Sequence, residues 1–117
     1  MIEELVGRVF CSRDCAHLAH WKSKSYSQHM ALGSFYDDVI EAIDSIVEVY
    51  QGNFGLIGPC SITCKTPADI VKTLREDAGW IVANRLKISK GLTPVENLLD
   101  SLLEIYFQTI YKLQNLA

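Results

Sequence analysis

Three side chains of one predicted helix, those of His29, Asp44 and Glu48, have the chemistry of metal ligands. Imidazole and carboxylate groups without a thiolate suit iron, manganese or zinc. Asp44 and Glu48 lie four residues apart, so a helix presents them on one face. His29 lies about 22 Å from Asp44 along the helix axis, because each residue adds about 1.5 Å. One helix therefore cannot bring all three to one ion, and a second helix or a second copy of the chain must complete the site.

Further candidate ligands lie near this set. His17 and His20 end the preceding predicted helix and, being three residues apart, face the same way. Asp37 belongs to an acidic stripe that also contains Asp44 and Glu48. A histidine beside an apolar arc can instead be a core residue that bonds a backbone carbonyl, and a carboxylate stripe can be a solvated helix face. Both interpretations stay open from the sequence.

Apolar periodicity predicts four helices and no strand, which makes an all-α, antiparallel four-helix bundle the expected fold. The first predicted helix covers residues 2–21 and the second covers residues 26–51. Ser25 and Gln28 have the spacing of a capping box at the start of the second helix. Gly52 is expected just past its end, where a left-handed conformation favours glycine.

A glycine-rich loop over residues 52–66 separates this helical pair from a second pair. The third helix is predicted to begin at Thr66-Pro67, with Asp69 in its first turn, and to end at Gly91. The fourth is predicted to begin at Thr93-Pro94, because threonine caps a helix and proline is tolerated in its first turn.

Composition restricts the classes of function. The 117 residues fit one domain, residues 1–117, whose small core would gain from oligomerisation. A formal net charge of −3 without a basic tail makes a nucleic-acid partner unexpected. The apolar runs are far shorter than the roughly eighteen residues that cross a membrane, and the N-terminus lacks a signal-peptide pattern. A cytoplasmic location is therefore the expectation.

Four cysteines form two pairs of equal spacing, Cys11 with Cys15 and Cys60 with Cys64. Such pairs could make one four-thiolate zinc site or two disulfides. Free cysteine is also a common small core residue, and a reducing compartment keeps thiols free. Free thiols are the favoured interpretation, with the zinc site and the disulfides as alternatives.

The stretch from His17 to Gly52 resembles the first helical pair of the Dps family, the ferritin-like proteins that store iron in starved bacteria. In that family a His-Trp pair closes the first helix and a second histidine opens the next. An Asp follows fifteen positions later, a Glu four beyond it, and a glycine pair ends the helix. The corresponding residues of this chain are His20, Trp21, His29, Asp44, Glu48 and Gly52. The chain also resembles small ferritin-like proteins of bacteria and their phages.

The resemblance implies a ferritin-like, iron-binding protein whose sites lie between two subunits related by a two-fold axis. Iron is the expected metal, ahead of manganese or zinc. The implied ligands are His17 or His20, His29, Asp37, Asp44 and Glu48. The family also has a carboxylate four positions after the second histidine, where this chain has Gly33. The resemblance therefore implies metal binding by a homodimer or larger homo-oligomer and leaves ferroxidase activity open.

A second hypothesis belongs to a different class of function. The chain would be a non-catalytic helical oligomer, encoded by a phage and present in the host cytoplasm, that binds a host protein or sequesters a small molecule. Its acidic charge and exposed aromatic side chains would then matter more than His29.

Overall fold

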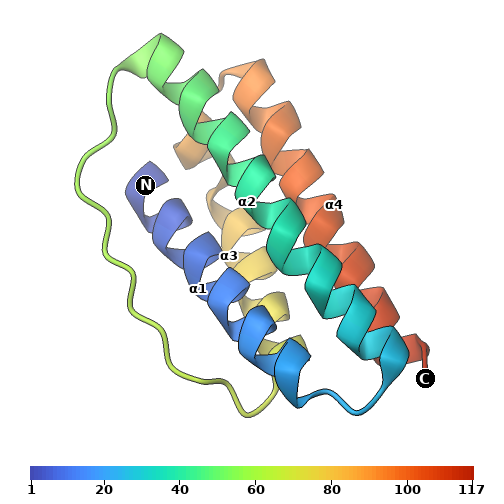
Figure 1. Cartoon of the computed structure of the whole chain (residues 1–117). Coiled ribbons are helices and arrows are strands. Elements are labelled where there is room, and N and C mark those ends of the chain that lie inside the picture. Colours follow the sequence, from blue (N-terminus) through green and yellow to red (C-terminus); the bar gives the residue numbers. More distant parts are fainter.

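The computed structural model describes residues 1–117 and contains four α-helices and no strand (Figure 1). The helices are α1 (Ile2–Lys22), α2 (Tyr26–Phe54), α3 (Ile70–Ser89) and α4 (Thr93–Asn115). They lie side by side in a bundle that measures 44 × 24 × 21 Å. The predicted all-α four-helix bundle is confirmed.

The connections make two helical hairpins joined by one long crossover (Figure 1). α1 packs on α2 and α3, and α4 packs on the other sides of the same two helices. Residues 55–69, here called the strap, run back along the length of α1 before α3 begins, so neighbouring helices are antiparallel all round the bundle. A long crossover between two helical hairpins is one of the known connection patterns of four-helix bundles.

A cluster of 22 buried apolar residues fills the space between the helices. At its centre, Phe35 of α2 and Tyr106 of α4 are fully buried, and their rings meet edge to face with centroids 5.0 Å apart. All four helices contribute to this cluster, and they do so through apolar residues at helical spacing. The tyrosine hydroxyl also gives the core a polar group that must find a partner.

At the start of α2 the predicted serine cap is present, but the second bond of the capping box is not, because the N–H of Ser25 donates to Ser23 Oγ at 3.3 Å. The predicted start of α3 is wrong. Ser25 Oγ accepts a hydrogen bond from the backbone N–H of Gln28 at 3.4 Å. Thr66-Pro67 lies in the strap, and Asp69 caps α3 by accepting a bond from the N–H of Lys72 at 3.2 Å. The prediction that α3 starts at residue 66 is wrong because the strap stays extended along α1 and the aspartate is the cap that comes after it.

The predicted ends of α2 and α3 also shift. α2 continues past Gly52 to Phe54, and Gly55, with φ 91°, follows its last residue. The Phe54 ring packs on the Tyr50 ring at 4.9 Å, and the Lys90 ammonium lies 4.6 Å from the centre of the Phe54 ring. The contact between Phe54 and Lys90 joins the ends of α2 and α3, and it requires the extra turn of α2. α3 ends just before Lys90, one residue earlier than Gly91 would imply.

α4 begins as the sequence predicts, within one residue. Thr93 is its first residue and Pro94 its second, while Leu92 occupies the capping position without a side-chain bond. No helix of the structure has both the length and the apolar character that crossing a membrane requires.

Candidate functional site

His20 and His29 form a reciprocal pair where α1 meets the beginning of α2. Nδ1 of His20 lies 2.6 Å from the carbonyl oxygen of His29, and Nδ1 of His29 lies 3.0 Å from the carbonyl oxygen of His20. The two rings stack with centroids 3.6 Å apart. A carbonyl oxygen only accepts, so each Nδ1 must donate its N–H. In the neutral rings both Nε2 atoms then keep a free lone pair.

The third histidine lies next to this pair in an aromatic environment. The His17 ring stacks on Tyr36 of α2 with centroids 4.1 Å apart, and the Trp21 ring lies 4.5 Å from it. The Arg13 guanidinium lies 5.4 Å from the centre of the Tyr36 ring. His17 thus has a packing role between α1 and α2, and the Trp21 side chain remains 67% exposed.

Gly33 has a local structural reason in this chain. A Cβ at Gly33 would lie 3.2 Å from Cε1 and 3.4 Å from Nδ1 of His20. Such contacts are tighter than the usual van der Waals distance, so a side chain there would require the His20 ring to shift from the position in which it stacks on His29. The residue that lacks the expected carboxylate is therefore the one that lets the two imidazoles stack.

The carboxylates predicted as ligands lie elsewhere on α2. Asp37, Asp44 and Glu48 are all exposed. Asp44 and Glu48 border a shallow cavity of about 220 Å³, whose wall includes Phe10 of α1 and Ile57 of the strap. Within one chain no three His, Cys, Asp or Glu side chains lie close enough together to hold a metal ion. The structure thus brings His20 and His29 together but leaves the carboxylates apart from them.

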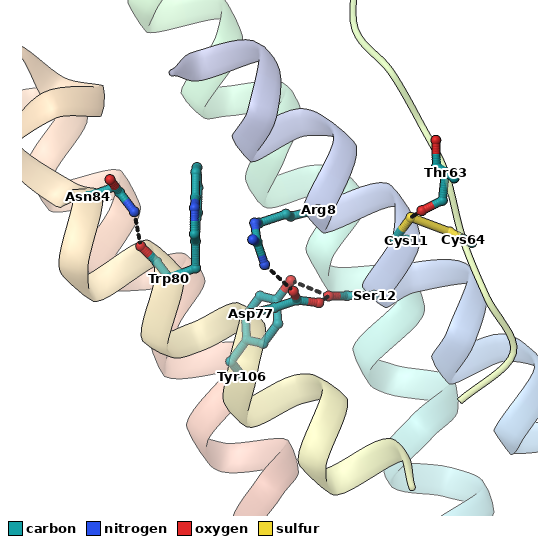
Figure 2. Close-up of polar contacts among 9 residues, drawn as sticks. All are labelled: Arg8, Cys11, Ser12, Thr63, Cys64, Asp77, Trp80, Asn84 and Tyr106. Carbon is teal, nitrogen blue, oxygen red and sulfur yellow. Dashed lines mark hydrogen bonds and ion pairs between the residues drawn. A yellow bond between two sulfur atoms is a disulfide. The ribbon is translucent and has the colours of Figure 1, made fainter. Parts of the chain in front are cut away.

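A second polar cluster, which sequence reasoning missed, lies inside the bundle between α1, α3 and α4 (Figure 2). Tyr106 donates its hydroxyl to Ser12 Oγ at 2.8 Å, and Ser12 donates to Asp77 at 2.5 Å. Arg8 donates to the other carboxylate oxygen of Asp77 at 3.0 Å, and its guanidinium lies over the Trp80 ring at 4.7 Å. The sequence did contain one sign of this cluster, because Asp77 lies on the apolar face of α3, where a charged residue needs a partner.

Burial controls the titration of this cluster. It raises the pKa of Asp77 above its ordinary value of 3.8, although the hydrogen bonds from Ser12 and Arg8 and the Arg8 charge act in the opposite direction. Burial likewise raises the pKa of Tyr106, which stays protonated at neutral pH. Every member has a partner, which is how a buried polar network stabilises one packing arrangement.

The strap follows one stripe of α1. Glu3 Oε2 accepts a hydrogen bond from the N–H of Gly58 at 2.8 Å. The carbonyl oxygen of Ser61 occupies the space beside Gly7 that a Cβ would fill in any other residue. Cys11 is bonded to Cys64 in a disulfide. Glu3, Gly7 and Cys11 recur every four residues, so one face of α1 holds the strap.

The structure corrects the expectation that all cysteines are free thiols. Cys11 and Cys64 are paired, whereas Cys15 is a buried free thiol and Cys60 a half-buried one. The strap brings Cys64 against α1, a contact that spacing along the sequence could not reveal. The zinc-site alternative also fails, because the four sulfurs do not gather into one cluster.

Comparison with known proteins finds one matching family and one similar phage protein. Residues 20–113 match the profile of a family described as a family of unknown function, DUF5856. The chain is also similar to an uncharacterised 14.6 kDa protein encoded in the mobD-rI intergenic region of Enterobacteria phage T4. The identity is 26% over 114 residues, which cover 95% of this chain and 86% of the phage protein. No solved structure matches significantly. The matching family is not Dps, so the resemblance to Dps proteins stays a prediction.

Proposed function

The chain belongs to the DUF5856 family, and from its side-chain geometry we propose that it binds a transition metal, iron first, at sites shared by two copies of the chain. His20 and His29 of one copy would supply imidazoles. Asp44 and Glu48 of the second copy would supply carboxylates. Imidazole and carboxylate together suit iron, with manganese and zinc as less favoured occupants.

The observation that supports this proposal most directly is the reciprocal bonding of His20 and His29. Histidine ligands of metals usually donate their other ring N–H to a carbonyl or carboxylate, which sets the tautomer and orients the ring. Both rings here have Nδ1 within hydrogen-bonding distance of a carbonyl oxygen, at 2.6 and 3.0 Å. The free atom of each ring is Nε2, the one that could bind the metal.

The placement of the carboxylates supports a site between two copies. Both residue sets lie where α1 and α2 pack together: His20 and His29 stack beside the turn that joins the two helices, and Asp44 and Glu48 border a cavity also lined by Val6 and Phe10 of α1. With a two-fold axis crossing α2 near Asp37, the histidines of one copy would lie beside the carboxylates of the other copy. The same contact would cover the exposed Trp21 ring and the half-buried Phe10.

Iron itself would supply redox chemistry at such a site, and the carboxylates would favour its retention as Fe(III). The chain's own contribution is to hold two imidazoles with Nδ1 bonded to carbonyl oxygens and to present the carboxylates in water. His17, stacked on Tyr36, supports the helix pair that carries the imidazoles. Asp37 would lie close to the two-fold axis and add negative charge near both sites.

A subunit-mixing experiment tests the proposal. His29→Ala and Glu48→Ala proteins are prepared separately, unfolded together, refolded and loaded with Fe(II) without oxygen. In a mixed dimer one site loses both residues and the other keeps both, so binding lost in each parent returns to about half the wild-type value in each mixed dimer. Lys24→Ala, an exposed residue of the α1–α2 turn, is the control.

Two outcomes would count against the shared site. If mixing restores no iron binding although both parents lack it, the ligands belong to one copy. If wild-type protein purified without chelator contains no iron, manganese or zinc, stays monomeric and fails to bind Fe(II), the metal proposal fails.

The similarity to a phage protein favours a second candidate, a non-catalytic oligomer that binds a host protein in the host cytoplasm. α3 and α4 each expose large apolar side chains that the bundle does not use. These are Val82, Leu86, Phe107 and Tyr111. A metal-free protein that loses a host partner on Leu86→Ser and Phe107→Ser substitution, and keeps its helical content, would support this candidate.

A further inference from the structure

Two sulfurs of α1 lie beside the same short segment of the strap. Cys11 is bonded to Cys64, and Cys11 Sγ lies 2.9 Å from the carbonyl oxygen of Thr63 (Figure 2). One turn further along α1, the Cys15 thiol donates to the carbonyl oxygen of Lys65 at 3.5 Å. Cys64 is thus flanked on both sides by residues that contact an α1 cysteine.

From this geometry we infer that Cys11, Cys15 and Cys64 form a thiol–disulfide exchange site, at which the strap can be fastened to α1 in either of two positions. In the observed position Cys64 is bonded to Cys11. In the second it would be bonded to Cys15, about 6 Å further along the helix axis. The external ligand of the site is a small monothiol of the glutathione class.

The chemistry is balanced in both reactions. In the internal exchange Cys15 loses its proton to water, its thiolate attacks Cys64 Sγ, and Cys11 leaves as a thiolate that takes up a proton, with no net oxidation. In the external reaction one monothiol attacks Cys64 and releases Cys11, and a second attacks the mixed disulfide. Two monothiols then become one oxidised disulfide, and Cys11 and Cys64 become thiols.

Exposure and burial distinguish the roles of the three sulfurs. Cys64 is exposed, so a dissolved thiol can reach it. Cys15 is buried, and burial together with the charges of Asp77 and Asp14 raises its thiol pKa. A raised pKa lowers the fraction of attacking thiolate. Cys15 is therefore the minor exchange partner of Cys64, and Cys11 remains its main disulfide partner.

The exchange would change a cavity as well as a bond. Beneath the strap lies a polar cavity of about 350 Å³, lined by Arg8, Asp77 and Gly7 from the helices and by Ser61 and Thr63 from the strap. A local move of Cys64 from Cys11 toward Cys15 would carry the neighbouring Thr63 away from this cavity, while the carbonyl of Ser61 stays at Gly7, where no Cβ opposes it.

The test maps disulfides in the full chain after equilibration with reduced and oxidised glutathione at pH 8, acid quenching, alkylation and peptide mass spectrometry. Wild type is expected to contain Cys11–Cys64 as the major form and Cys15–Cys64 as a minor one. Cys11→Ser is expected to shift Cys64 to Cys15 as its main intrachain partner. Cys60→Ser is the matched control and should leave the wild-type map unchanged.

The inference is overturned if folded Cys11→Ser pairs Cys64 only with glutathione or Cys60 in a buffer that keeps wild type oxidised. Circular dichroism establishes whether that variant folds. If it does not fold, the wild-type map decides: a Cys15–Cys64 peptide supports the exchange, and its absence, with Cys15 alkylated in every molecule, rejects it. None of these readouts depends on metal binding.

Discussion

Replacing Asp77 by alanine tests whether the buried polar cluster stabilises the bundle. The carboxylate accepts a bond from Ser12, whose side chain is completely buried, and one from Arg8, whose side chain is 40% exposed. After the change, Arg8 can turn to water, so its contribution is small, as for surface ion pairs. The Ser12 hydroxyl cannot, and an unsatisfied buried donor costs about 1–3 kcal/mol. A small cavity adds to this cost.

The expected loss is therefore about 3 kcal/mol, a large part of the roughly 5–15 kcal/mol by which domains are stable. For a chain of this length each kcal/mol corresponds to about 4 °C in Tm, so Tm should fall by about 12 °C. Thermal and urea unfolding, followed by circular dichroism, measure both quantities. Asp100→Ala is the matched control, because it breaks an exposed 2.8 Å ion pair with Arg85 and should cost less than about 1 kcal/mol.

A double substitution measures how strongly Ser12 and Asp77 depend on each other. Adding Ser12→Ala to Asp77→Ala removes the donor that the first change leaves without an acceptor, although it also deprives Tyr106 of its partner. The double variant should therefore lose less stability than the two single variants lose together, and the difference should be about 1 kcal/mol. Additive effects, or an Asp77→Ala protein as stable as Asp100→Ala, would refute the role assigned to the cluster.

Three further predictions follow from single contacts. Because the folded pKa of Asp77 is raised, the proton-linked part of its contribution to stability, which is separate from the hydrogen bonds that Asp77→Ala removes, is fully present below its unfolded value of about 3.8 and is lost as pH rises through the folded value. The difference in urea midpoint between wild type and Asp77→Asn should therefore change over that window, and a pH-independent difference would contradict it. At Gly79 an added Cβ meets nothing within 4 Å, so Gly79→Ala should raise the free energy of unfolding by about 1 kcal/mol, measured in urea. Gly33→Ala should not show this gain, because its Cβ would displace the His20 ring. Equal gains from the two substitutions would disprove the packing role of Gly33. Gly7→Ala should push the strap off α1 and speed its cleavage by protease several-fold, with Gly79→Ala as the unaffected control.

Local patterns predicted the fold well because helices are formed by near neighbours. The Ser25 cap and the start of α4 are where the sequence places them. The end of α2 was missed because its last turn is held by contacts with Lys90, the residue that follows the end of α3. The start of α3 was missed because its preceding residues lie extended against α1, and a capping pattern cannot reveal that contact.

The sequence indicates which helices carry the candidate ligands, whereas the distances between these side chains come from the structure. His20 and His29 do meet, as their positions at either side of a short turn favour. Asp44 and Glu48 do not reach them within one chain, as the helix length already implied. The role of Gly33 was not visible in the sequence, because it depends on how closely His20 of α1 approaches α2.

What the sequence determined by itself is the all-α class, the number of helices and most of their apolar faces, since each depends on the periodicity of residues close together in the chain. The tertiary structure decided the rest: the path of the strap along α1, the pairing of Cys11 with Cys64, and the chain of bonds from Tyr106 to Asp77. These contacts join residues more than fifty positions apart. No local pattern encodes them, because they form only when the packing of four helices brings distant side chains to the same place.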